Sequence, residues 1–341
     1  MKNLKKNMGY KTFIIAELSA NHNNNFDIAV KTIEAMAKAG ADAVKVQTYT
    51  ADSLTLDVDN EHFGPRKEGL WKGKRPYEIF KEGSMPYEWQ PKLKKITEEL
   101  GLKFFSSPFD RHGVDFLEGM DVELYKIASF EITDIPLIDY VASKKKPMII
   151  STGVAELSDI ELAVATCRKN GVDDITLLKC TSEYPATVAA ANLATISNLR
   201  ETFNVKVGVS DHTMGSTVPV VAVALGATVV EKHFILDRSL GGPDSAFSME
   251  PHEFAAMVNA VREAEVAVGN VTYSISDKDK TRRRSIYVSK DIKKGDILSE
   301  ENIKCVRPGF GLHPKNFNTV IGKKVNEDIE KGTPLSWSLI N

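Results

Sequence analysis

The first 269 residues alternate short apolar runs with amphipathic stretches, and this alternation constrains the fold more than any other feature. The apolar runs are rich in Ile, Val and Phe, as in strands that are buried on both faces of a parallel sheet. Eight such runs, each followed by a helical pattern, predict an α/β fold closed into a (β/α)8 TIM barrel. An open doubly wound sheet is the alternative, but no Gly-x-Gly-x-x-Gly follows the first run. The expected strands are 12–18, 43–48, 103–107, 124–128, 148–151, 175–179, 206–210 and 228–233, and the clearest helices are 28–39 and 254–267.

One connection, residues 51–86, is unusually long and offers no long periodic segment. Insertions on the catalytic face of a barrel often form lids or walls of the substrate site. We therefore expect this segment to border the functional site.

A second, smaller unit is expected after Gly269. Residues 270–284 are polar and end in three arginines, a composition typical of a linker. Within residues 285–341, the segment 291–299 is echoed by 328–336, each with Asp-Ile followed by a Lys-Gly turn. Because so short a segment buries little core by itself, we expect it to dock on the barrel or on a neighbouring subunit.

Composition describes a globular protein with ample core and argues against several partners. The chain is 42% hydrophobic and 26% charged, and its net charge of -2 gives no case for nucleic acid or anionic membranes. Its start lacks the apolar core of a signal peptide, and no apolar stretch approaches the roughly 18 residues of a membrane span. Three cysteines without a Cys-x-x-Cys motif are expected to be reduced, which predicts a cytoplasmic protein.

Two of the apolar runs end in histidine, as Ser210-Asp211-His212 and Glu231-Lys232-His233. On consecutive barrel strands, both imidazoles reach the carboxyl-terminal rim, where such barrels keep their chemistry. A lone strand-end histidine more often serves only as a hydrogen-bonding group. The pair predicts a divalent-metal site, and two imidazoles with oxygen ligands suit Mn²⁺ or Co²⁺ and tolerate Mg²⁺.

Charged residues lie on three other expected strands. Lys45 and Lys126 are costly to bury without an anion, and alternation puts Gln47 on the same side as Lys45. Glu17 ends the first strand and is expected to orient groups near the metal or to transfer a proton; loop stabilisation is the alternative. A Schiff-base lysine, as in aldolases, is the rival use of Lys126. The histidine pair argues against it, because a metal already activates the electrophile.

Small hydroxyl residues end several of the remaining strands. Hydroxyls and free backbone N–H groups at helix starts bind phosphate, although capping explains most such residues individually. With two lysines they predict a cradle for a phosphate and a carboxylate, and there is no P-loop. In the loop after the eighth strand, Asp244 is a candidate for holding hydroxyl or amide groups of a substrate, and a plain surface loop is the alternative. The hydroxyl residues are Ser106, Ser107, Ser151, Thr152, Thr181, Ser182 and Ser210.

From residue 12 to residue 340, the chain resembles the sialic acid synthase family. Its tail, with Val306-Arg307-Pro308-Gly309-Phe310-Gly311, resembles the antifreeze-like (SAF) domain of that family. The other motifs that carry the resemblance are Glu17…Asn21-His22, Lys45-Val46-Gln47-Thr48, Ser107-Pro108-Phe109, Tyr125-Lys126-Ile127-Ala128-Ser129, Ser210-Asp211-His212 and Glu231-Lys232-His233-Phe234.

The resemblance implies an enzyme that condenses phosphoenolpyruvate with an N-acetylated amino sugar aldehyde. The family's SAF domain is swapped within a homodimer, so that Arg307 would reach the active site of the partner. The implied catalytic residues are Glu17, Lys45, Lys126, His212 and His233, with the two histidines holding the metal. The implied phosphoenolpyruvate-binding residues are Lys45, Ser107, Lys126, Ser129, Ser151, Ser182 and Ser210, and the implied sugar-binding residues are Glu17, Gln47, Tyr184, Asp244 and Arg307.

Within the family, the chain looks most like the pseudaminate branch, because residues 16–22, 48–56 and 69–71 follow that branch. This implies a diacetamido-trideoxy-altrose as the sugar, whose methyl group would suit apolar walls such as Leu70 and Trp71. Ser182 stands where neuraminate synthases often have Asn. The alternatives are an N-acetylneuraminate or legionaminate synthase and, more distantly, a Schiff-base aldolase or lyase. A carbohydrate-binding protein would leave the histidine pair unexplained.

Overall fold

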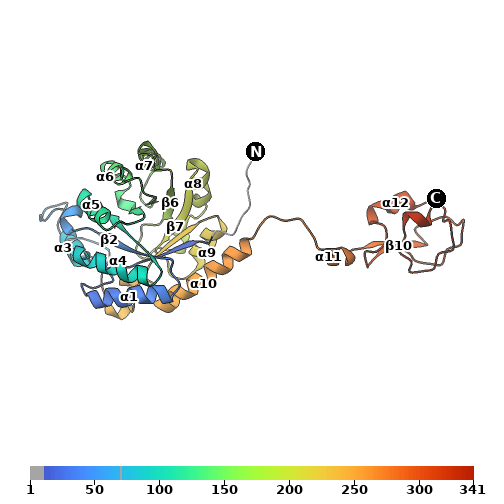
Figure 1. Ribbon diagram of the computed structural model, residues 1–341, viewed down its shortest axis with the longest axis horizontal. Coiled ribbons are helices and arrows are strands. Elements are labelled where there is room, and N and C mark those ends of the chain that lie inside the picture. Colours follow the sequence, from blue (N-terminus) through green and yellow to red (C-terminus); the bar gives the residue numbers. More distant parts are fainter. Residues whose placement is uncertain (1–10, 70) are drawn as a thin grey trace. The chain divides into compact units, whose positions relative to one another are not determined.

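The computed structural model describes residues 11–69 and 71–341 and consists of two compact units that separate after Gly269. In the first unit, eight parallel strands pair in chain order and close between β8 and β1, with helices around them (Figure 1). The predicted TIM barrel is therefore confirmed, and each strand begins and ends within one residue of the predicted run. The strands are β1 (Phe13–Glu17), β2 (Ala43–Thr48), β3 (Lys103–Pro108), β4 (Tyr125–Ile127), β5 (Met148–Ser151), β6 (Ile175–Cys180), β7 (Lys206–Asp211) and β8 (Val229–His233).

The interior of the barrel changes from apolar to polar along the strands. One interior layer is an apolar cluster to which six strands contribute one buried side chain each. Because successive side chains of a strand point to opposite faces, the residue two positions later points into the barrel again. That next layer is mostly polar, so the apolar cluster forms a floor beneath it. The apolar residues are Ile15, Ala43, Phe105, Ile149, Leu178 and Val229, and two positions later come Glu17, Lys45, Ser107, Ser151, Cys180 and Glu231.

The helices pack one face on the outside of the barrel, and several of them begin at a residue whose side chain caps the helix. Helix α1 (Phe26–Lys38) starts after Asn25, whose side chain accepts a hydrogen bond from the Ile28 amide, and its buried face carries Ile33. Because caps precede the first apolar residue of a helix, α1 and α10 begin before the predicted ranges. The other helices of this layer are α4 (Gln90–Glu99), α5 (Arg111–Gly119), α6 (Ile135–Ala142), α7 (Leu157–Lys169), α8 (Thr195–Phe203), α9 (Thr217–Ala224) and α10 (Pro251–Val268).

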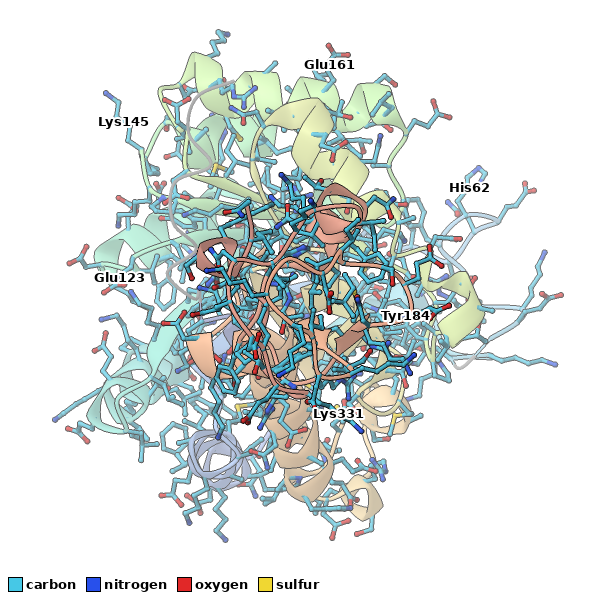
Figure 2. The ribbon with its side chains drawn as sticks, turned by 90° about the vertical axis from the view of Figure 1, so that its right-hand side faces the viewer. His62, Glu123, Lys145, Glu161, Tyr184 and Lys331 are labelled. Atoms are coloured by element: carbon cyan, nitrogen blue, oxygen red, sulfur yellow. The ribbon has the colours of Figure 1, made fainter. Side chains whose placement is uncertain are left out.

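The outer surface of the barrel unit is charged. Glu123, Lys145 and Glu161 are exposed and point outward in Figure 2. Across the described residues, no helix is both long and apolar enough to cross a membrane. All three cysteines are free thiols.

The long connection after β2 contains two short helices, α2 (Ala51–Leu54) and α3 (Pro76–Gly83). Helix α3 was not predicted, because its eight residues are too few to give a clear periodic pattern in the sequence. Its start is fixed by Pro76 and by the Glu78 carboxylate, which accepts a hydrogen bond from the Arg75 amide at 3.1 Å. Leu70, one of the two predicted wall residues in this segment, lies outside the described residues.

The second unit has a core of its own around an antiparallel pair, β9 (Ser285–Val288) and β10 (Ile303–Val306). The two echoed segments contact each other reciprocally. The Asp328 carboxylate accepts from the Lys294 amide at 2.9 Å, and the Asp291 carboxylate accepts from the Lys331 amide at 2.8 Å. The sequence repeat is thus a pair of matching turns that clasp each other. Short helices α11 (Asp277–Thr281), within the expected linker, and α12 (Phe317–Val320) complete this unit.

Candidate functional site

A pocket of about 580 Å³ opens at the carboxyl ends of the barrel strands. Leu54, Trp71 and Ile79 line it, so residues 51–86 border the site as predicted. Ser107 is buried below strand β3's end and is not among the lining residues, and Arg307 belongs to the second unit. The structure brings the other predicted residues together on the pocket wall: Glu17, Lys45, Gln47, Lys126, Ser129, Ser151, Ser182, Tyr184, Ser210, His212, His233 and Asp244.

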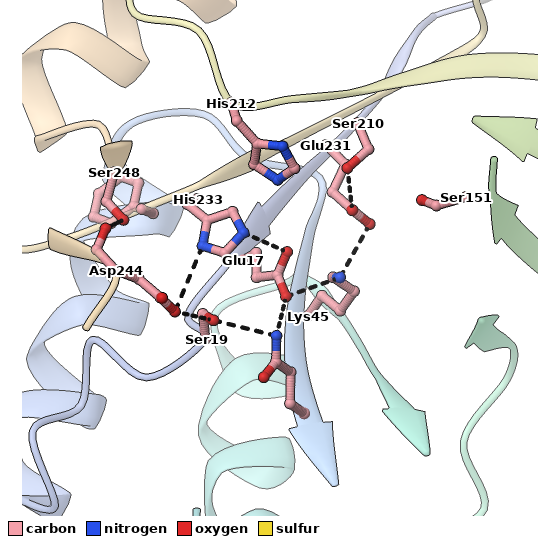
Figure 3. A network of polar contacts seen from close by, with 12 residues as sticks. Glu17, Ser19, Lys45, Ser151, Ser210, His212, Glu231, His233, Asp244 and Ser248 are labelled. Atoms are coloured by element: carbon pink, nitrogen blue, oxygen red, sulfur yellow. Dashed lines mark hydrogen bonds and ion pairs between the residues drawn. The ribbon is translucent and has the colours of Figure 1, made fainter. Parts of the chain in front are cut away.

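Four buried charged side chains, those of Glu17, Lys45, Lys126 and Glu231, lie at the base of the pocket, above the apolar cluster. Lys45 Nζ lies 2.9 Å from Glu17 Oε1 and 3.3 Å from Glu231 Oε2 (Figure 3). Lys126 Nζ lies 3.6 Å from Glu231 Oε1. All four side chains are at most 3% exposed, and such burial is tolerated because each charge has an opposite neighbour. Two ammonium groups and two carboxylates make this cluster neutral overall.

The two lysines differ in how well their charge is compensated. Burial would lower the pKa of Lys45, but Glu17 and Glu231 outweigh it and raise that pKa above its ordinary value. Burial lowers the pKa of Lys126, and Glu231 does not fully offset it because Lys45 repels the second positive charge. Lys126 is therefore the cation that a bound anion would stabilise most.

Hydroxyl groups surround Lys126 on the side of β4 to β6. Lys126 Nζ donates to Ser151 Oγ at 2.7 Å, and the Gly153 amide donates to Ser129 Oγ at 3.2 Å. A side chain at Gly153 would fill the space between them, because its Cβ would lie 2.1 Å from Ser182 Oγ and 2.9 Å from Ser129 Oγ. The absent Cβ keeps open a cradle of hydroxyls beside a cation, which is suited to phosphate or carboxylate.

The histidine pair lies side by side, with ring centroids 5.2 Å apart and ring planes at 60°. His212 Nδ1 is 3.0 Å from the carbonyl oxygen of Thr181, so a proton there leaves Nε2 free to act as a ligand. His233 Nδ1 is buried without a hydrogen-bond partner, and His233 Nε2 lies 3.3 Å from Glu17 Oε2. These imidazoles fit a divalent ion. Within residues 11–69 and 71–341, no group of three or more His, Cys, Asp or Glu is placed to hold one.

The wall across the pocket from Lys126 contains hydrogen-bonded polar groups that suit a sugar. Asp244 Oδ2 accepts from Ser19 Oγ at 2.5 Å and lies 4.0 Å from His233 Nδ1. Gln47 Nε2 donates to Glu17 Oε1 at 2.8 Å. The Tyr184 ring packs 4.5 Å from that of His212. The rest of the wall is mostly apolar, with Leu54, Trp71, Ile79, Phe80, Phe109 and Phe130, and it also includes the cationic side chain of Arg66.

Several titratable pocket residues were not predicted to act in the site, among them Arg66 and Glu231 as well as Glu131 and Cys180. Glu131, in the turn after β4, has a buried Oε2 without a hydrogen-bond partner, and burial raises its pKa to about 7 despite the charge of Lys126. Cys180 ends β6; burial would raise the pKa of its thiol, but the proximity of His212 and of the Ser129 and Ser182 hydroxyls lowers that pKa to about 7. Position near a strand end was the available signal for these two residues, since Cys180 is the last residue of β6 and Glu131 lies in the turn after β4. The cysteine pattern predicted only that Cys180 is reduced.

Comparison with known proteins gives two family matches. The NeuB family matches residues 32–273, and the SAF domain matches residues 283–341. Pseudaminic acid synthase of Campylobacter jejuni is 48% identical over 335 residues, 97% of each chain. That of Helicobacter pylori is 43% identical, over 95% of this chain and 96% of the other.

Two further relatives mark the breadth of the likeness. N,N'-diacetyllegionaminic acid synthase of Legionella pneumophila is 38% identical, over 96% of this chain and 94% of the other. The crystal structure of N-acetylneuraminic acid synthetase from Leptospira borgpetersenii superposes with a TM-score of 0.71 and 32% identity, over 80% of this chain and 90% of the other.

Proposed function

The chain belongs to the NeuB family and carries a SAF domain, and from that premise we propose that it is a pseudaminic acid synthase. It condenses phosphoenolpyruvate with a diacetamido-trideoxy-altrose and water, giving pseudaminic acid and phosphate. Higher identity to pseudaminic acid synthases than to the legionaminic acid synthase supports this choice. The reaction forms a C–C bond between the methylene carbon of phosphoenolpyruvate and the aldehyde carbon of the sugar.

The observation that carries the proposal is the undercompensated charge of Lys126 beside a hydroxyl cradle. Phosphoenolpyruvate brings the negative charge that Glu231, at 3.6 Å, supplies only in part. Ser129 and Ser151 donate to its oxygens from the other side, and the Gly153 amide orients the Ser129 hydroxyl by donating to it. Lys45 contributes a second positive charge, which Glu17 and Glu231 hold in place.

We also propose that His212 and His233 hold a divalent ion: Mn²⁺, Co²⁺ or Mg²⁺. When bound, such an ion acts as a Lewis acid that polarises a carbonyl oxygen. The arrangement of His212 supports it, since the Nδ1 contact with Thr181 orients the ring with Nε2 available.

Around these histidines, the residues of the chain orient the reactants. Gln47 and Asp244 hold hydroxyl and amide groups of the sugar, and Glu17 lies between Lys45 and His233. As the C–C bond forms, water adds to the former enol carbon and phosphate leaves with cleavage of the C–O bond. Glu131, with a pKa of about 7, can take up or release a proton beside Lys126.

The proposal extends to a cytoplasmic, domain-swapped homodimer in which Arg307 of one protomer grips the sugar in its partner's pocket. Arg307 is exposed within its own unit. If the swap occurs, an inactive His233→Ala subunit should complement an inactive Arg307→Ala subunit, because a mixed dimer contains one site with both residues intact. Activity should return after subunit exchange. Verified mixed dimers without activity would refute the swapped arrangement.

Product analysis tests the function itself. The purified chain is incubated with phosphoenolpyruvate, Mn²⁺ and one sugar at a time, namely the precursors of pseudaminate, legionaminate and N-acetylneuraminate. Mass spectrometry should show the nonulosonic acid with the pseudaminate precursor and one equivalent of phosphate. Preferred turnover of either other sugar would replace the proposed substrate, and an imine trapped by borohydride on Lys126 would replace the reaction class.

A further inference from the structure

Lys232, the residue before His233, is buried outside the pocket, and its side chain contacts the residues on both sides of His212. Its side chain is 1% exposed and is not among the pocket-lining groups. Its Nζ donates to Asp211 Oδ2 at 2.7 Å and also to the carbonyl oxygen of Thr213. Asp211 and Thr213 flank His212 in the chain. One ammonium group therefore contacts the residues on both sides of His212, a carboxylate on one side and a main-chain carbonyl on the other, and belongs to the residue before His233.

This contact lies where the β-sheet no longer holds His212. Strand β7 ends at Asp211, which pairs with Lys232 in the last register position between β7 and β8. The chain then turns, and Asp211 Oδ1 accepts from the Thr213 amide at 2.9 Å. Past the end of the strand, the Ala186 amide donates to the His212 carbonyl oxygen at 3.2 Å, and the contacts of Asp211 and Lys232 hold the residues on either side of His212.

Stability alone gives little reason for an ion pair here. Buried ion pairs recover little more than the cost of desolvating them, and well-packed apolar residues of similar size often serve folding equally well. An ion pair differs from an apolar contact because each of its hydrogen bonds has a defined geometry. Here those hydrogen bonds fix the position of the end of β7 relative to the end of β8, and each of these strand ends carries one of the histidines.

We propose that Lys232 is a positioning residue that fixes His212 relative to His233 and so sets the affinity of the pocket for a divalent ion. The inference rests on the proposed function, because the ion belongs to that function. Removal of groups that orient metal ligands typically weakens metal binding about 10- to 100-fold. We expect an effect of that size although Lys232 does not contact the pocket.

The test compares Mn²⁺ binding to the full chain, measured by electron paramagnetic resonance without substrates. Lys232→Met removes both contacts, and Asp211→Asn/Lys232→Met removes both charges while an amide oxygen still accepts from Thr213. Lys179→Met is the matched control: this lysine is also next to last in its strand and donates to a main-chain carbonyl, that of Cys180, at 2.8 Å.

Both Lys232 variants should raise the Mn²⁺ dissociation constant about 10- to 100-fold, and the visible spectrum of bound Co²⁺ should change. Lys179→Met should leave both unchanged. Lys232→Met leaves the buried Asp211 carboxylate unpaired and could fail to fold. In that case the double variant tests the proposal, because it contains no unpaired buried charge. A folded double variant with wild-type Mn²⁺ affinity and Co²⁺ spectrum would overturn the proposal.

A second readout does not require a metal. The chain has seven histidines, so ¹⁵N-histidine labelling gives few imidazole signals. The signals of His212 and His233 should shift in the double variant and stay in place in Lys179→Met. If the wild-type chain binds neither Mn²⁺ nor Co²⁺, the metal proposal fails. The ring signals then decide whether Lys232 positions the histidines: unchanged signals would overturn it.

Discussion

The two sides of the pocket differ in how far their charges are already matched. On the side of β1 and β2, Lys45 contacts Glu17 at 2.9 Å and Glu231 at 3.3 Å. On the side of β4 to β6, Lys126 lies 3.6 Å from Glu231, donates to the Ser151 hydroxyl and has nearby the carboxyl group of Glu131, whose pKa burial raises to about 7. The first side is a preformed framework, whereas the second has cationic capacity left for a ligand. Variants of equal chemistry on the two sides should therefore fail in different ways.

The largest loss of activity is expected from substitution of the two histidines, which lie between the two sides of the pocket. His233→Ala, like His212→Ala, should abolish turnover with the fold intact, because each removes half of the proposed protein ligands of the metal. Circular dichroism would monitor the fold and phosphate release the activity. Full activity of chelator-treated wild-type enzyme would contradict the metal requirement.

On the framework side, Lys45→Met should chiefly damage stability. It leaves the buried carboxylates of Glu17 and Glu231 without the cation between them, and breaking a buried pair in this way costs about 3–5 kcal/mol. Urea unfolding would measure the loss in the free energy of unfolding. Lys126→Met should lower the free energy of unfolding much less. Equal losses for the two variants would show that the two sides of the pocket are equivalent.

On the ligand side, Lys126→Met should chiefly damage binding. One lost charge-assisted hydrogen bond is worth about 1.5–3 kcal/mol, so the KM for phosphoenolpyruvate should rise about 10- to 100-fold. The KM for the sugar should change much less, which steady-state kinetics with each substrate varied would show. An unchanged KM for phosphoenolpyruvate would make Lys126 structural.

The smallest effect is expected from narrowing the cradle. Gly153→Ala places a methyl group against Ser182 and Ser129, and the Ser182 side chain can rotate away in part. We expect the KM for phosphoenolpyruvate to rise several-fold, on the order of 1 kcal/mol, as for one weakened hydrogen bond. Gly119→Ala, where a Cβ meets nothing within 4 Å, is the matched control. Equal kinetics of the two variants would mean that no ligand occupies the cradle.

Much of this comparison was predictable from local patterns. The positions of Lys45 and Lys126 on strands followed from apolar runs of the right length, and strand alternation placed Gln47 on the side of Lys45. The pairing of the two histidines followed from consecutive strands of a barrel. These inferences hold because neighbouring parallel strands present their carboxyl ends at one rim.

Contacts across the closure of the barrel were not predictable in this way. Glu17 and His233 are register partners between β1 and β8, and Glu231 reaches both lysines from the last strand. The sequence analysis named Glu231 only as part of a motif and gave it no role. Partners so far apart in the chain are brought together only when the sheet closes.

The sequence by itself determined the barrel, the second unit and nearly all the polar residues of the pocket, because strand periodicity is a local property that fixes which side chains point inward. Only the tertiary structure decided which cation is compensated, which oxygen is buried without a partner, as in Glu131, and that Ser107 lies off the pocket wall. Burial and charge pairing depend on distances between strands. No single stretch of sequence contains those distances, and they also determine that Lys232 grips the chain on both sides of His212.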